Sequence, residues 1–190
     1  MRQIAVLTGD LIGSTEAPPA VLEATMALLS AAAGEVAGWP GARSGPEGTQ
    51  FTRYRGDGWQ MVVVDPALAL RAALFLLARL RAGKGLLDSR IAIGTGAAES
   101  LGTADLSDAR GPAFEASGRG LDGMGRQRQL AIAGEGITPL HEVIVDLVEE
   151  HARHWSREQA EAAALWLDPA NPTLADVAPR LGISPQAVTS

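Results

Sequence analysis

Apolar residues in the first two thirds of the chain alternate between short runs and helical stripes. Residues 2–8 form a run of aliphatic and β-branched side chains that ends at Gly9-Asp10, which predicts a buried strand. A helix is predicted next, opened by two consecutive prolines and closed at Gly38. Its apolar positions recur at helical spacing: Val21, Leu22, Met26, Leu28, Leu29 and Val36.

Two further strands and a second helix follow a loop rich in glycine and proline. The composition of residues 38–48 predicts a surface loop that buries nothing. Residues 49–54 and 59–64 are predicted to be strands, joined by the hairpin turn of residues 55–58. Pro66 opens the next helix, whose buried stripe is Leu68, Ala72, Phe75, Leu76 and Leu80.

The remaining elements of this region complete an α+β domain. Residues 90–94 alternate as a fourth strand, and residues 97–103 are predicted to return antiparallel to it. A glycine-rich helix over residues 112–124 and a short strand over residues 129–133 follow. This order predicts a ferredoxin-like βαββαβ core, in which helices cover one face of an antiparallel sheet.

From Thr138 onward the pattern is helical only. An amphipathic helix leads to Trp155, and Ser156 with Gln159 forms a capping box that opens another helix. We therefore divide the chain into a domain of residues 1–135 and a helical segment of residues 136–190. The apolar side chains of the amphipathic helix are Leu140, Val143, Ile144, Leu147 and Val148.

Residues 174–188 have the features of a helix-turn-helix. A first helix is followed by a tight turn at Gly182 and by a second helix with Ser184 as N-cap. We expect Gln186 and Thr189, near the exposed start of the second helix, to contact DNA in the major groove. Only about two turns of that helix precede Ser190, so an incomplete unit is expected. A small helical pair used for dimerisation is the alternative, because few basic residues surround it.

Composition sets limits on these interpretations. With 46% apolar residues the chain can build a sizeable core. The lack of cysteine excludes disulfides and thiolate metal sites, and the short apolar run at the N-terminus predicts neither a signal peptide nor a membrane contact. We therefore expect a cytoplasmic protein. A net charge of −6 argues against attraction of nucleic acid to the whole surface, so DNA must be contacted by one segment.

Two carboxylates stand beside glycines at the ends of strands predicted to be neighbours. Asp10 ends the first strand and Asp57 lies at the hairpin tip. Because adjacent strands lie about 4.8 Å apart, the two carboxylates can share Mg²⁺ with the phosphates of a substrate. Gly9, Gly13, Gly56 and Gly58 would let backbone amides approach a triphosphate, and Ser14 is counted with Gly13 among the nucleotide-binding positions. The alternatives are that the hairpin pair is only a turn signal and that Asp10 with Ser14 caps a helix.

The order of these motifs resembles that of class III adenylyl and guanylyl cyclases, over roughly residues 1–133. The shared motifs are Asp10 followed by Gly13-Ser14-Thr15, the hairpin Gly56-Asp57-Gly58, the strand at residues 90–96, and residues 111–119. A cyclase-like domain followed by such a C-terminal element also resembles the bacterial SatD-like proteins.

The cyclase resemblance implies roles for individual residues. Asp10 and Asp57 match two metal-binding aspartates, Arg53 stands where a lysine reads the purine, and Asp108 matches a base-reading aspartate. Arg119 matches the arginine that stabilises phosphate charge in the transition state. The residues by themselves also allow Arg53 to be a cross-strand charge, Asp108 an N-cap of the following helix, and Arg119 an exposed charge.

One position departs from the family pattern. Glu115 stands four residues before Arg119, where the family has an asparagine, and a carboxylate there repels a triphosphate that an amide would orient. We therefore count Glu115 with Arg119 as catalytic positions whose chemistry is altered.

These observations predict a bacterial regulatory protein. Its cyclase-like domain is expected to bind a nucleoside triphosphate with Mg²⁺ without turning it over, and its C-terminal segment to bind DNA as part of a homodimer. One alternative is an active Mg²⁺-dependent purine nucleotide cyclase whose active site lies between two chains. Another is a dimeric scaffold that binds no ligand, which intrachain partners for Asp10 and Asp57 would favour.

Overall fold

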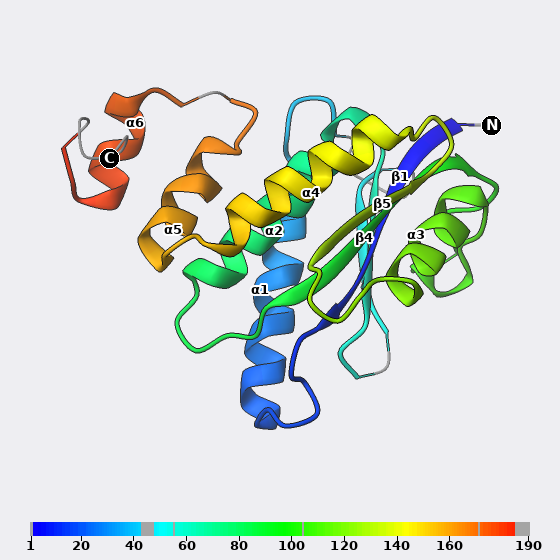
Figure 1. The fold of residues 1–190 in the computed structure, drawn as a ribbon, viewed down its shortest axis with the longest axis horizontal. Coiled ribbons are helices and arrows are strands. Elements are labelled where there is room, and N and C mark those ends of the chain that lie inside the picture. The colour runs from blue at the N-terminus through cyan, green and yellow to red at the C-terminus, as the bar shows by residue number, and fades with distance from the viewer. Residues whose placement is uncertain (1, 43–47, 55, 104, 171, 185–190) are drawn as a thin grey trace.

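The computed structural model describes residues 2–42, 48–54, 56–103, 105–170 and 172–184. It shows a five-stranded sheet with helices on both faces (Figure 1), which confirms the expected mixed α+β architecture. The sheet order is β2-β3-β1-β4-β5, and only the β4–β5 pair is parallel. The strands are β1 (Arg2–Leu11), β2 (Gln50–Arg53), β3 (Trp59–Val63), β4 (Ser89–Ala98) and β5 (Leu130–Gly134).

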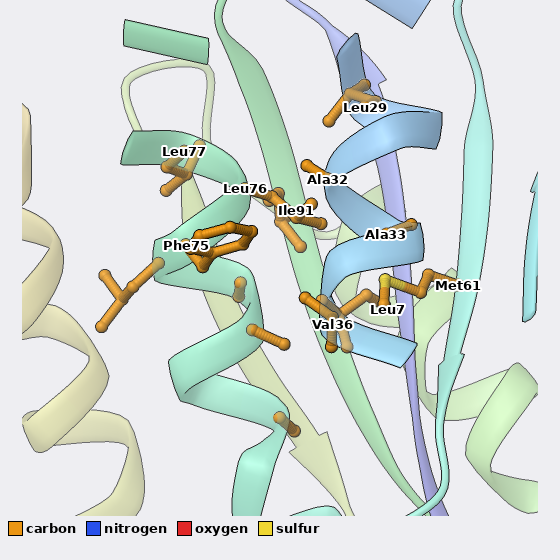
Figure 2. Close-up of a cluster of buried hydrophobic side chains, with 14 of the residues drawn as sticks. Leu7, Leu29, Ala32, Ala33, Val36, Met61, Phe75, Leu76, Leu77 and Ile91 are labelled. Atoms are coloured by element: carbon orange, nitrogen blue, oxygen red, sulfur yellow. The ribbon is translucent and has the colours of Figure 1, made fainter. Parts of the chain in front are cut away.

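Helices α1 (Pro19–Ala37) and α2 (Ala69–Ala82) cover the first face of the sheet. Their apolar stripes meet side chains of β1, β3 and β4 in the larger of two buried clusters (Figure 2). The second helix begins later than predicted, because Pro66 opens a short 3-10 turn, η1 (Pro66–Leu68), capped by the carboxylate of Asp65. Of the predicted stripes, α1 buries Met26, Leu29 and Val36 fully, and α2 buries Ala72, Phe75, Leu76 and Leu80. The other predicted positions, Val21, Leu22, Leu28 and Leu68, are half-buried.

The second face of the sheet is covered by α3 (Pro112–Asp122), so the prediction that helices cover one face is wrong (Figure 1). Ile4, Val6 and Val62 pack there against Phe114 of α3. The physical reason lies in the central strands, where consecutive residues of β1 are fully buried instead of alternating between core and solvent. A strand that is apolar on both sides needs helices on both sides.

The predicted antiparallel strand at residues 97–103 is also wrong. β4 itself continues to Ala98, and beyond it Ser100 makes only an isolated bridge with Arg110. A second 3-10 turn, η2 (Leu106–Asp108), follows, and α3 then crosses to β5, which pairs parallel to β4. The sheet is therefore mixed and not antiparallel throughout, because a strand–helix–strand crossover returns the chain in the same direction.

The loop predicted to bury nothing contributes a large side chain to the core. Trp39 is buried and packs edge-on against Phe75 of α2, with ring centroids 5.2 Å apart. Residues 43–47 of the same loop lie outside the described residues. The glycine and proline content predicted the loop correctly but gave no sign that Trp39 within it would be buried.

Three helices follow the sheet: α4 (Pro139–Arg153), α5 (Arg157–Trp166) and α6 (Leu174–Leu181). The capping box of Ser156 and Gln159 opens α5 as predicted. Helices α4 and α5 add Val145, Ala152 and Ala164 to the same buried cluster as α1 and α2. The division into residues 1–135 and 136–190 stays a prediction.

Helix α6 ends at Gly182, whose backbone is left-handed, with φ of 66°. The described residues thus include the first helix of the predicted helix-turn-helix and the tight turn after it. Gln186 and Thr189, the predicted DNA contacts, lie outside the described residues.

Helix α1 is long and apolar enough to cross a membrane, judged by length and composition alone. Core helices of globular domains meet the same criterion, and α1 buries Met26, Leu29, Ala32 and Val36 inside the fold. Its apolar character is therefore accounted for by packing against the sheet.

Candidate functional site

Asp10 and Asp57 lie at the same end of the sheet. β1 pairs antiparallel with β3, with Gly9 opposite Trp59, so the last residues of β1 lie beside the turn that precedes β3. The charge of Asp57 also reaches Arg90, the residue that pairs with Asp10. Two acidic side chains from distant parts of the sequence are thus brought together, as the sequence predicts.

Arg90 neutralises Asp10 directly. In the sheet register Asp10 stands opposite Arg90 of β4, whose Nε donates a 2.9 Å hydrogen bond to one carboxylate oxygen while Nη2 donates to the other. Both side chains are about three-quarters buried, at 27% and 26% exposed. The hydrogen bond to Asp10 raises the pKa of the Arg90 guanidinium, partial burial opposes this, and the charges of Asp10 and Asp57 add to the rise. Sequence analysis treated Arg90 only as a strand residue.

Ser14 donates a hydrogen bond from its hydroxyl to the Asp57 carboxylate. The turn that carries Ser14 is shaped by Gly13, whose φ of 75° favours glycine. The alternative that Asp10 and Ser14 cap a helix is wrong, since α1 starts only at Pro19 and has no side-chain cap. Ser14 instead links the β1 end to the hairpin turn.

A strip of hydrogen-bonded polar side chains leads from this cluster along the α3 face of the sheet. Thr8 lies two residues before Asp10 and therefore on the same face of β1. Its hydroxyl lies 2.7 Å from that of Ser117 on α3 and accepts a 2.9 Å hydrogen bond from Gln60. Gln60 in turn accepts from the Tyr54 hydroxyl at 2.5 Å. Sequence analysis missed this strip, because the strand register that aligns its members is not visible in the sequence.

The two residues expected to recognise a base are not brought together. Arg53 of β2 makes two hydrogen bonds of 2.7 and 2.8 Å to Glu23 of α1, which raise the pKa of Arg53. Its neighbour Thr52 points to the other face, where its hydroxyl accepts from the backbone of Leu106 in η2. Arg53 is therefore held toward α1, on the face of the sheet opposite η2.

Asp108 stabilises the loop that precedes it by accepting hydrogen bonds from Thr103. Its carboxylate accepts hydrogen bonds of 3.0 and 2.8 Å from the backbone and hydroxyl of Thr103, which lower the pKa of Asp108. The alternative that Asp108 caps α3 is wrong, since the N-cap of that helix is Gly111. The side chain is occupied by a local turn.

Glu115 and Arg119 pair with each other on the exposed side of α3. Arg119 Nη1 lies 3.2 Å from Glu115 Oε2, and the two side chains are 71% and 68% exposed. An ion pair this open to water is weak, so either group can leave it for another partner. Within one chain Arg119 is directed at Glu115 and not at the aspartates.

The residues at the sheet end fit a divalent cation only in part. Among the described residues, no group of three or more histidine, aspartate or glutamate side chains is arranged to hold a metal ion. Two carboxylates supply part of the six oxygen ligands of Mg²⁺, and Arg90 already pairs with the Asp10 carboxylate. Water or phosphate oxygens would complete the coordination, and a phosphate is also a ligand toward which Arg90 can turn.

Comparison with solved structures found chains of similar fold. Searches against models of protein families and against curated proteins gave no match. A structure described as the crystal structure of the guanylyl cyclase Cya2 aligns over 69% of this chain and 74% of that chain, at 19% sequence identity and a TM-score of 0.47. A likeness of this size assigns neither a family nor an activity to the chain.

Proposed function

We propose that the chain is a regulatory protein that binds a nucleoside triphosphate together with Mg²⁺ at the sheet end formed by Asp10, Asp57 and Arg90. The observation that carries this proposal is the juxtaposition of two carboxylates with one arginine. The carboxylates offer hard oxygen ligands, and the guanidinium offers paired donors that match a phosphate. Bound Mg²⁺ would neutralise phosphate charge there, while Arg90 and Ser14 would orient the phosphates.

The strand order of the sheet supports a ferredoxin-like core as part of the same proposal. β1 lies between β3 and β4 and is antiparallel to both, so each of the first two helices links strands that are separated by one neighbour. This arrangement places the ends of β1, β3 and β4 side by side. A cyclase-like use of this fold would exploit that edge for nucleotide binding.

We propose further that nucleotide binding occurs without turnover. Glu115 places a further carboxylate beside Arg119, and a carboxylate near a triphosphate adds repulsion. The two alternatives make different predictions. An active purine nucleotide cyclase would release cyclic nucleotide and pyrophosphate, whereas a scaffold would bind no nucleotide. The intrachain Asp10–Arg90 pair is the observation that favours the scaffold.

Calorimetric titration of the full chain with ATP, GTP, CTP or UTP in Mg²⁺ tests the binding site. We expect binding of at least one of them, weakened by at least about 10-fold in Asp57→Asn, because the amide removes one anionic oxygen ligand. Asp168→Asn is the matched control and should bind like the original, since Asp168 caps a turn after α5. Absence of heat with all four nucleotides would overturn the proposal, and pyrophosphate release would replace it with the cyclase alternative.

The segment that starts with α6 is proposed to contact DNA. Support comes from the helix and left-handed turn at Gly182, which match the first half of a helix-turn-helix. Fluorescence anisotropy with labelled random duplex DNA should show binding that weakens steeply between about 50 and 200 mM salt. Replacing Arg180, at the end of α6, with Glu should weaken binding further. Equal anisotropy with and without protein at low salt would contradict DNA binding.

A further inference from the structure

Helix α4 carries large apolar side chains on its outer face. Leu140, Val143, Ile144 and Leu147 are 66%, 52%, 42% and 67% exposed, and their spacing of three, four and seven residues places them on one stripe. The opposite face of the same helix is buried through Val145, Glu149 and Ala152. One face of α4 thus packs on the core, while the apolar stripe on its other face lies at the outside of the molecule (Figure 1).

A hollow of about 590 Å³ runs beside this stripe, between α4 and the start of α2. Its apolar lining includes Leu70, Ile132 and Ile137, and Ile144 belongs to both the hollow and the stripe. Leu140, Val143 and Leu147 thus form a ridge next to a groove of similar character. A surface with a ridge and an adjacent groove can fit a copy of itself, as a two-fold interface requires.

Charges along α4 favour an antiparallel copy. After Leu147 the outer face of the helix becomes polar with Glu150 and His151. Among the described residues, the exposed Glu150 carboxylate pairs with Arg153 and with His154, the residue that caps the helix. In a parallel pair the two Glu150 side chains would face each other and repel. In an antiparallel pair each Glu150 would lie near the N-terminal end of the other α4, whose dipole attracts an acidic group even though the first turn of that helix already carries Glu142.

We infer that a second copy of this chain docks on the α4 stripe, with the two α4 helices antiparallel. Leu140 packs against Leu147 of the second copy, and Val143 packs against its Ile144. This register matches apolar positions only with apolar positions. The inferred interface does not depend on nucleotide or DNA binding, so its test is separate from the tests of the proposed function.

Sedimentation equilibrium of the full chain tests the interface. The original protein is expected to be a dimer, and Leu147→Glu should raise its dissociation constant by about 100-fold or more, because each dimer then buries two unpaired carboxylates. Ile183→Glu is the matched control, since Ile183 is 44% exposed but lies after α6. Circular dichroism spectra should stay alike, because both sites are exposed and neither change reaches the core. A monomeric original protein, or a dimer that Leu147→Glu leaves intact or Ile183→Glu weakens equally, would overturn the inference.

Disulfide trapping tests the antiparallel register, since the natural chain has no cysteine. Val143→Cys lies near the two-fold axis and should cross-link to its own copy under mild oxidation. Leu140→Cys should not, because the two copies of residue 140 would be separated by roughly 10 Å along the helix axes at 1.5 Å per residue. Mixing Leu140→Cys with Leu147→Cys should restore cross-linking. Self-linking of Leu140→Cys as fast as Val143→Cys would overturn the antiparallel pairing.

Discussion

Gly94→Ala is expected to destabilise the protein by about 3 kcal/mol, the largest stability loss that we predict for a single added methyl group. Gly94 lies in β4 directly beneath α3. A Cβ atom at this position would collide with the carbonyl oxygen of Ala113 and the backbone nitrogen of Ser117. Because both atoms belong to the helix backbone, relief requires α3 to move away from the sheet, which opens the cluster around Phe114 and separates Ser117 from Thr8.

Urea denaturation provides the measurement, with Gly118→Ala as the matched control. Gly118 lies within α3 itself, and a Cβ there meets no atom within 4 Å. Alanine has the higher helix propensity, so Gly118→Ala should stabilise the protein by about 0.5–1 kcal/mol. The two variants add the same methyl group, but we expect one to lower and the other to raise the free energy of unfolding. Equal stability of Gly94→Ala and the original protein would contradict the close packing of α3 on β4.

The elements that sequence analysis located well are those with a local signal. The stripes of α1 and α2 repeat at helical spacing, and the hairpin between β2 and β3 follows from its turn residues. The side of the sheet on which α3 packs has no such signal. Residues 4–7 are buried on both faces, so the strand shows no alternation that could tell one face from the other. The missing side chains of Gly94 and Gly96 in β4 are the feature of the sequence that permits the close approach of α3, and they do not by themselves say which face is covered.

The candidate site shows the same limit. Asp10 and Asp57 were correctly expected at one end of the sheet, because Asp10 follows the first predicted strand and Asp57 lies in the turn of the neighbouring hairpin. The side chains that pair with these two aspartates were not predicted, since the pairing of Asp10 with Arg90 depends on the register of β1 against β4. Register is set by tertiary packing over the length of both strands. The roles implied for Arg53, Asp108, Glu115 and Arg119 stay predictions, and each of these side chains has a local partner.

Arg90→Gln is expected to change the affinities for two ligands in opposite directions. Loss of the guanidinium should weaken nucleoside triphosphate binding by at least about 30-fold, because a charge-assisted pair to phosphate disappears in a partly buried site. The same change leaves Asp10 and Asp57 without their shared cation. Binding of Mg²⁺ in the absence of nucleotide should therefore tighten by about 10-fold.

The opposite changes in affinity for triphosphate and for Mg²⁺ distinguish a ligand site from a scaffold. If Arg90 serves only to fix β4 against Asp10, the variant loses stability and gains no affinity for Mg²⁺. Arg79→Gln is the control, since Arg79 also pairs with a carboxylate, that of Glu35, and is 29% exposed compared with 27% for Arg90. It should change neither affinity. Calorimetry with Mg²⁺ alone and with triphosphate gives both values, and a parallel change of the two would contradict the proposed site. Arg90 then connects the fold to the proposed function, because the same guanidinium that pairs with Asp10 would turn to phosphate when a nucleotide binds.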